Sequence, residues 1–569
     1  MKFTSPTRRR RLARALLPAL VIIGLATTFA ACGGSSSSSN GSSGTSGKSG
    51  SSSEPAGTPA SGTSNAPLVV NVSVPPASLD PTYTYTNQDA GLSGSFYSTL
   101  TQVGQEPGPI PGTTQQNLST TAVKPYLAES WKISDGGKTY TFKLRPGLKF
   151  PSGHPLDAAA VKYSLERTIK VQGGGYSVLE ETQLKPPLVT SVSAPDPTTV
   201  VIKYQRPAPN QLQVLSTPTA GAIYDPSVVN AHGGVQAGKP NKWLASHTAG
   251  YGPYLLDSYQ PGHRMVLKAN PDFFQPALAN NVIINFITDD STLLLQARSG
   301  AADVTLGLSP QGTHSITSDS CCKVGAFKSR MAETLQLPQI DKYSFFKNEQ
   351  FRQALSYAFP YKDILDKVAF GYGKLYSGEW MPVFPWYSTK VGAPHPTDMN
   401  KAKQLMQQSG VKTPVSFPIY VAEGDTIGKQ IATAAAGAWQ PLGVNAKVQV
   451  VSAAQLVDVV YTSHASANVF IDGPQVVAPD YYWAYDLQCP KNNPYNDTLV
   501  CIPEADALMK KIPAATGQNR QNMLDQVNTM YVNASPRIWA YNAANTVVLG
   551  KNVTKFYASD LPEVRFWSK

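Results

Sequence analysis

The chain has 569 residues, enough to bury several hydrophobic cores and to divide into two or more lobes. Its formal charge of +11 is concentrated near the N-terminus, where the first 31 residues hold six Lys and Arg side chains and no acidic residue. The rest of the chain carries about +5, which is too mild an excess to favour nucleic acid as a partner.

The N-terminal segment 1–32 has the features of an export signal. Four consecutive arginines, which leave Sec and twin-arginine export both open, precede an apolar run from Ala15 to Phe29. This run is short for a stable transmembrane span. Small residues then lead to Cys32, and the sequence FAAC resembles the bacterial lipobox, in which the cysteine is acylated. The resemblance implies a lipoprotein signal in residues 1–32 with lipidation at Cys32; an ordinary secretory signal is the alternative.

Residues 33–66 are almost all Ser, Gly, Thr, Pro and Ala. Such a segment has too few apolar groups to pack, so we expect a disordered linker. A random coil of roughly 33 residues spans on the order of 30 Å. The linker therefore suits a domain tethered to a membrane surface.

A folded α/β core is predicted from Lys124 to Ile169. Alternating apolar residues predict two strands, with a hairpin turn at Asp135-Gly136-Gly137. Asp157 is then placed to cap a helix whose apolar residues repeat every four positions. A further hairpin is expected at 189–203, and a helix followed by a strand at 293–305.

Three sequence motifs in this stretch resemble those of a known protein family. P-x-L-A-E-S-W, D-G-x-x-Y-T-F-x-L-R-P-G-x-x-F and G-x-P-L-x-A-x-x-V resemble the signature of the family 5 extracellular solute-binding proteins, the peptide- and nickel-type receptors of ABC importers. The resemblance implies an α/β, two-lobed periplasmic-binding-protein type II fold, large and cluster C-like, with an extra subdomain in lobe I. The implied boundaries are 67–310 for lobe I, with the subdomain at roughly 100–235, then 311–540 for lobe II and 541–569 for a return to lobe I.

The second half of the chain continues in helices and strands. The segment at 350–373 predicts a helix that breaks at Pro360. Residues 398–410 predict a helix ended by Gly410, and a helix at 424–442 with a strand at 446–451 predicts a βαβ unit.

Candidate ligand contacts come from three loops that face the cleft in the family. Peptide-binding relatives place an aspartate, which pairs with the peptide ammonium, at the position of Gln475, and a neutral amide cannot supply that charge. Asp472 could substitute. Asp480 could instead cap the helix that follows it. The predicted ligand-binding residues are Tyr83, Tyr85, Trp380, Asp472, Gly473, Gln475, Asp480, Tyr481 and Tyr482.

Four cysteines remain besides Cys32. Cys489 and Cys501 enclose a polar loop and make the best disulfide pair, and a bridge in this region recurs in the peptide-binding members of the family. The adjacent Cys321 and Cys322 could form a vicinal disulfide or stay reduced. Neither pair has His or carboxylate partners at regular spacing, so no metal site is expected.

Enzyme motifs are absent from the sequence: there is no HExxH, paired CxxC, Walker A loop or G-x-S-x-G, and two S-x-x-K matches lack the companion K-T-G. We therefore expect no catalysis and no cofactor. The sequence predicts a monomeric, lipid-anchored receptor on the outer face of the cell membrane. It would capture an oligopeptide or similar solute between its lobes and deliver it to a membrane permease. The alternatives are an oligosaccharide or other polar solute, or a surface sensor or adhesion lipoprotein without transport.

Overall fold

The computed structural model describes residues 66–84, 92–119, 121–182, 186–474, 476–491, 493, 495–560 and 562–569. The chain forms two units, residues 1–62 and 63–569, and only the second is described below. The predicted signal with Cys32, all but the last residue of the linker, and the candidates Tyr85 and Gln475 lie outside the described residues. Within the described part, no helix combines the length and apolar character that a membrane span requires.

The first lobe is built on a seven-stranded sheet in which β1 pairs in parallel with β12 and β13, and every other pairing is antiparallel. Two helices, α6 (Asp290–Ser299) and α7 (Pro310–Ile316), accompany it. In sheet order the strands are β10 (Tyr254–Gln260), β11 (Arg264–Ala269), β12 (Asn281–Phe286), β1 (Leu68–Val72), β13 (Val304–Leu306), β21 (Asn545–Gly550) and β14 (Cys322–Phe327).

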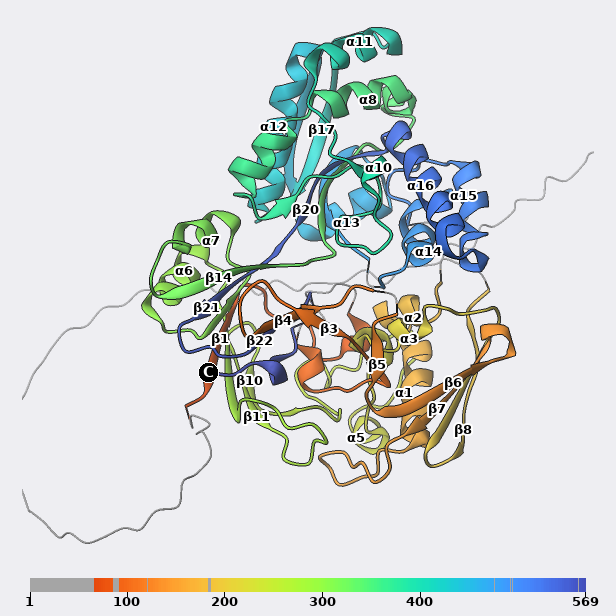
Figure 1. Ribbon diagram of the computed structural model, residues 1–569, viewed down its shortest axis with the longest axis vertical. Coiled ribbons are helices and arrows are strands. Elements are labelled where there is room, and N and C mark those ends of the chain that lie inside the picture. The colour runs from red at the N-terminus through yellow and green to blue at the C-terminus, as the bar shows by residue number, and fades with distance from the viewer. Residues whose placement is uncertain are drawn as a thin grey trace, which may run out of the picture. The chain divides into compact units, whose positions relative to one another are not determined.

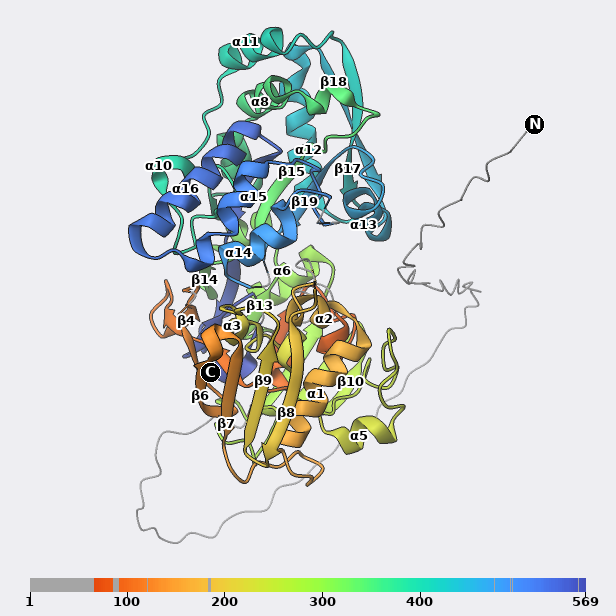
Figure 2. The same ribbon diagram turned by 90° about the vertical axis from the view of Figure 1, so that its right-hand side faces the viewer.

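A subdomain of the first lobe holds the stretch that carries the family resemblance. Its antiparallel sheet has the order β6 (Ala128–Ser134), β7 (Thr139–Leu144), β9 (Thr199–Tyr204) and β8 (Val189–Asp196), and α1 (Ala158–Val171) packs against it (Figure 2). The Asp157 carboxylate accepts a hydrogen bond from the Ala160 amide, 3.0 Å away, as an N-cap. Both predicted hairpins and the capped helix are confirmed.

Smaller elements complete the first lobe. Short sheets pair β2 with β5 and place β4 between β22 and β3. These strands and the remaining helices are β2 (Thr101–Val103), β3 (Gln105–Pro107), β4 (Thr113–Gln116), β5 (Val123–Pro125), β22 (Phe556–Ala558), α2 (Gly174–Leu179), α3 (Gln211–Val214), α4 (Pro218–Gly221) and α5 (Pro226–Ala231).

The second lobe is built on a six-stranded sheet, with the order β16 (Gly373–Lys374), β20 (Arg537–Ala543), β15 (Ala332–Gln336), β19 (Ala467–Asp472), β17 (Val415–Ala422) and β18 (Val444–Val451). β17, α12 (Thr426–Trp439) and β18 form the predicted βαβ unit, with the two strands parallel. Figure 1 labels β17 and α12, and Figure 2 labels all three elements. The other helices are α8 (Glu349–Ala358), α9 (Tyr361–Asp363), α10 (Thr389–Gly392), α11 (Met399–Ser409), α13 (Ala453–Tyr461), α14 (Pro479–Tyr482), α15 (Pro503–Met509) and α16 (Gly517–Ala534).

Two helix ends in this lobe match their predictions. α8 stops at Ala358, two residues before Pro360, because proline cannot continue the helical hydrogen bonds. α11 ends at Gly410, whose φ of 64° lies in the left-handed region that glycine adopts at low cost.

The chain crosses between the two sheets at residues 328–331 and again at Ala544. The first crossing lies later than the predicted boundary at 310, because β14 pairs with β21 and keeps residues 311–327 in the first lobe. The return likewise follows β20 at Ala544. The Asn542 side-chain amide ties the two crossings together by donating to the carbonyls of Ser329 and Met331, at 2.9 and 2.8 Å.

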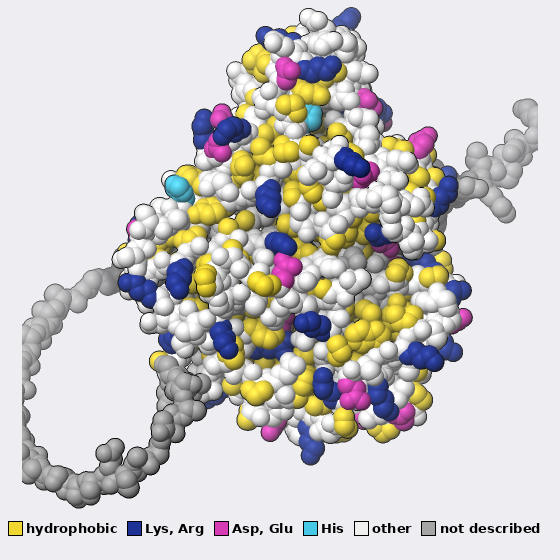
Figure 3. Space-filling view, in the orientation of Figure 1, with side chains coloured by type: hydrophobic (Ala, Val, Ile, Leu, Met, Phe, Trp, Pro, Cys, Tyr) yellow, Lys and Arg dark blue, Asp and Glu magenta, His cyan; other side chains and the backbone are white. Residues whose placement is uncertain are grey.

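On the face shown in Figure 3, Lys and Arg side chains are dispersed among acidic and uncharged ones.

Candidate functional site

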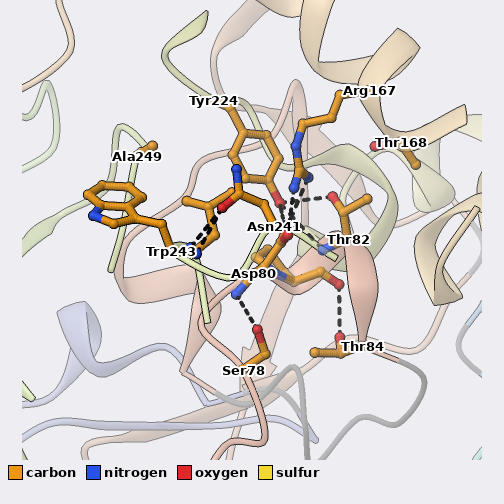
Figure 4. Close-up of polar contacts among 12 residues, drawn as sticks. Ser78, Asp80, Thr82, Thr84, Arg167, Thr168, Tyr224, Asn241, Trp243 and Ala249 are labelled. Carbon is orange, nitrogen blue, oxygen red and sulfur yellow. Dashed lines mark hydrogen bonds and ion pairs between the residues drawn. The ribbon is translucent and has the colours of Figure 1, made fainter. Parts of the chain in front are cut away.

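A buried ion pair anchors the segment that follows β1 (Figure 4). The Arg167 guanidinium donates to both carboxylate oxygens of Asp80, at 3.1 and 2.5 Å, and the Tyr224 hydroxyl donates to one of them at 2.8 Å. All three side chains are fully buried. Burial and the nearby Asp80 raise the pKa of Tyr224, which therefore stays protonated as a donor. Asp80, in the segment Ser78-Leu79-Asp80-Pro81, thus fixes the start of the loop and is not free for a solute.

Tyr83 lies at the end of the short helical turn that this anchor holds. It is half-buried beside Gly173, where a Cβ atom would come within 2.7 Å of the Tyr83 backbone. Glycine at this position lets the turn approach α2 closely. Tyr83 is not among the residues that line the two cavities described below.

The loop after β19 packs across from the second lobe onto the first. Val476, Ala478 and Tyr481 are buried within the hydrophobic core of the subdomain. Asp480 accepts a hydrogen bond from the Asn210 amide of the first lobe at 2.8 Å, and burial raises the pKa of its carboxyl. Ala478 is the N-cap residue of α14, and Asp480 lies in the first turn of that helix. This loop therefore holds the two lobes together.

A second carboxyl, that of Glu181, lies close to this contact. Burial, with Asp480 as a smaller cause in the same direction, raises the pKa of Glu181 to about 7. The Arg206 guanidinium, which donates to Glu181 at 3.0 Å, acts in the opposite direction and limits the rise. The contact between the lobes thus includes two carboxyls that hold their protons more tightly than usual.

Trp380 and Tyr482 lie in a hydrophobic core of the second lobe. Their exposed fractions are 1% and 3%, and their ring centroids are 6.1 Å apart. The Trp380 indole N–H already donates to the Leu524 carbonyl at 3.0 Å. The predicted ligand-binding role of these two rings is therefore not supported by their positions, which are those of packing residues.

Gly473 and Asp472 lie at the end of β19. A Cβ atom at Gly473 would meet the Arg330 carbonyl oxygen at 2.2 Å, so only glycine lets the strand pass the first crossing segment. Asp472 is the last residue of the strand and pairs with Ala332 of β15.

Both remaining cysteine pairs are bonded. A disulfide joins Cys489 to Cys501, and another joins Cys321 to Cys322. Among the described residues, no cluster of three or more His, Cys, Asp or Glu side chains could hold a metal ion.

Two cavities lie where residues of both lobes meet. The smaller, about 60 Å³, is bounded by the subdomain, Arg330, Val476 and Val477, and holds only a few water molecules. The larger is about 370 Å³, within the usual range of small-molecule sites. Its walls include Ser73, Val74, Leu306, Glu333, Tyr372, Ile427, Ile471, Tyr541, Asn545, Tyr557 and Asp560.

The larger cavity contains a residue that sequence reasoning missed. Glu333 is 4% exposed, and burial together with the nearby Asp425 raises its pKa to about 8. The signal available in the sequence was an acidic residue inside the short strand AETLQ, where a charge is costly to bury.

Comparisons with known proteins agree with this architecture. The model of the bacterial extracellular solute-binding proteins, family 5, matches residues 122–496. The probable D,D-dipeptide-binding periplasmic protein DdpA of Escherichia coli strain K12 is 26% identical over 504 residues, which cover 88% of this chain and 93% of that protein.

Solved structures share the two-lobed fold. The periplasmic binding protein DppA of Helicobacter pylori, in complex with the peptide STSA, has a TM-score of 0.74 at 20% identity and covers 88% of this chain and 98% of its own. NikZ of Campylobacter jejuni, in complex with Ni(L-His), has a TM-score of 0.72 at 20% identity and covers 88% and 99%. Because one fold serves a peptide and a metal chelate, the ligand has to be argued from the residues of the cavity.

Proposed function

The chain belongs to the family 5 bacterial extracellular solute-binding proteins, and on that premise we propose that it captures an oligopeptide or similar solute in the larger cavity. It then delivers the solute to the permease of an ABC importer. The observation that carries the proposal is the cavity itself, whose walls come from the strands of both lobes at the point where the chain crosses between them. A solute bound there touches both lobes at once.

The two crossings supply a hinge for capture. Each is short, and the hydrogen bonds from Asn542 bind one to the other, so rotation of the lobes is concentrated in a few residues. A solute that contacts both lobes favours the closed arrangement by its differential affinity for that state. The permease then recognises the closed form.

The residues from Val476 to Tyr481, which pack onto the first lobe, would move when the lobes separate. When the lobes separate, Asp480 leaves Asn210, and Tyr481 leaves the subdomain core to meet the incoming solute. Asp472 directly follows Ile471 of the cavity wall and remains a proposed contact to the solute. Tyr83 does not line this cavity, and the roles of Tyr85 and Gln475 stay predictions. We assign Trp380 and Tyr482 to packing.

We also propose that the receptor is a monomer held on the outer face of the membrane. Cys32 carries the lipid anchor, and the Ser/Gly-rich linker of residues 33–66 gives the lobes reach to the permease. Replacement of Cys32 by Ser, with fractionation of the cells, tests the anchor. The C32S protein is expected in the soluble fraction.

The ligand class is tested with pools of defined chemistry. Native mass spectrometry of the protein with a tripeptide-to-hexapeptide pool should show mass additions that match peptides, whereas a pool of neutral oligosaccharides should show none. Additions from the oligosaccharide pool alone would contradict the peptide assignment. Absence of binding from both pools would contradict capture of either class.

A further inference from the structure

Glu333 is one of the residues that line the larger cavity. It lies on β15, where its neighbours across the sheet are Ile471 of β19 and Tyr541 of β20. All three side chains line the cavity. An acidic residue here is flanked by an isoleucine and a buried tyrosine, which offer no positive charge.

The Glu333 carboxylate has no partner within the described parts of the chain: neither a hydrogen bond nor an ion pair reaches it. The contrast with Asp560, on the same cavity, is direct, since Asp560 accepts from the Ser329 hydroxyl at 2.8 Å and pairs with Arg330 at 3.4 Å. A carboxylate that is more than nine-tenths buried without a donor is costly, and natural proteins rarely keep one without use.

A second carboxyl increases the negative character of this region. Asp425 caps α12 by accepting from the Gly428 amide at 2.8 Å, and it is close enough to raise the pKa of Glu333. Arg330, which precedes Glu333 on the first crossing segment, is already engaged by Asp560. A negatively charged solute group would therefore be repelled from this wall, and a positively charged one attracted.

We propose that Glu333 anchors a cationic group of the solute, an ammonium or a guanidinium, inside the larger cavity. The inference rests on the proposed function and narrows its substrate class. The bound cation supplies the hydrogen-bond donors that the carboxylate lacks, and a charge-assisted bond in a cavity is stronger than a neutral one. The α-amine of a peptide and a basic side chain offer the same chemistry, so the experiment separates them.

Three tetrapeptides serve as probes in isothermal titration at pH 7.5: Ala-Ala-Ala-Ala, its N-acetylated amide, and the N-acetylated amide of Ala-Lys-Ala-Ala. The first has a free α-amine, the second has no cation and the third has only a side-chain cation. The protein should bind one cationic probe at least about 10-fold tighter than the neutral probe, as expected for a close buried charge pair. The cationic probe that binds more tightly shows whether Glu333 recognises an α-amine or a basic side chain.

Two substitutions test whether Glu333 is responsible for the preference for the cationic probe. Glu333→Gln keeps the shape and removes the charge, and it should lose the preference for the cation about 10- to 100-fold while binding the neutral probe as before. Glu129→Gln, an exposed residue of β6, is the matched control and should keep the preference. Unchanged binding of the neutral probe shows that the Glu333→Gln cavity is intact.

Two results would overturn the inference. If the unmodified protein binds neutral and cationic probes equally, or if Glu333→Gln retains the preference, Glu333 is not the anchor, and capture of peptides still stands. If the protein binds none of the three probes, the cation site and the peptide assignment both fall.

Discussion

Removal of the Glu333 charge should stabilise the unliganded protein at alkaline pH. Burial and Asp425 raise the pKa of Glu333 from 4.5 to about 8. Between these values the folded state binds more protons than the unfolded state, so the stability that comes from the protonated carboxyl is complete below pH 4.5 and is lost as the pH rises through 8. At 1.36 kcal/mol per pKa unit, this loss is about 5 kcal/mol.

Glutamine has the same shape as the protonated acid and does not titrate. The stability difference between Glu333→Gln and the unmodified protein should therefore be within about 1 kcal/mol at pH 4.5 and approach about 5 kcal/mol at pH 9. Other groups near Glu333, namely Asp425, Tyr541 and the pair of Asp560 with Arg330, are present in both proteins and contribute equally to first order.

Urea unfolding at pH 4.5, 7 and 9, followed by fluorescence of the second lobe, measures this difference. Glu129→Gln should track the unmodified protein at every pH, because that side chain is exposed. A difference between Glu333→Gln and the unmodified protein that is the same at all three pH values would refute the reasoning. It would mean that Glu333 does not change its protonation between pH 4.5 and 9.

Two structural contacts give further predictions. Asp80→Asn leaves the buried Arg167 without its counter-charge and should lower the free energy of unfolding by about 3–5 kcal/mol, measured in urea. Asp257→Asn, which removes an exposed ion pair, should cost no more than about 1 kcal/mol in the same assay, and equal losses would contradict the role of burial. Asn542→Ala removes two hydrogen bonds between the crossing segments and should cost about 1–3 kcal/mol. It should also speed limited proteolysis at residues 328–331, and an unchanged cleavage rate would argue against a hinge there.

Local structure was predictable wherever the signal was local. The hairpin at 135–137 needs only alternation and a glycine turn, and the helix after Asp157 needs only a cap and a four-residue repeat. The first crossing was not predictable in this way. β14 belongs to the first lobe because it pairs with β21, which lies near the C-terminus. No local pattern in the sequence CKVGAF predicts that pairing.

The candidate site shows the same division. Trp380 and Tyr482 are predicted to bind the ligand, but both fill a core, because a large ring is as useful for packing as for binding. Glu333 is not among the residues predicted from the sequence, because its surroundings come from distant parts of the chain. The neighbours that give it a role, Asp425 and Tyr541, come from other elements far along the chain, so a lone acid in a strand has no spacing to recognise.

The position of Glu333 links recognition to closure. Glu333 lies two residues after the first crossing segment, and its cross-strand neighbour Tyr541 lies three residues before the second crossing at Ala544. Once the pH exceeds the raised pKa of about 8, an unpaired carboxylate here destabilises the empty cavity, because the charge is buried without a donor. A cation removes that cost only when both lobes surround it. The charge that selects the solute is therefore placed where it also biases the hinge, so that an empty receptor favours opening and a loaded one stays closed.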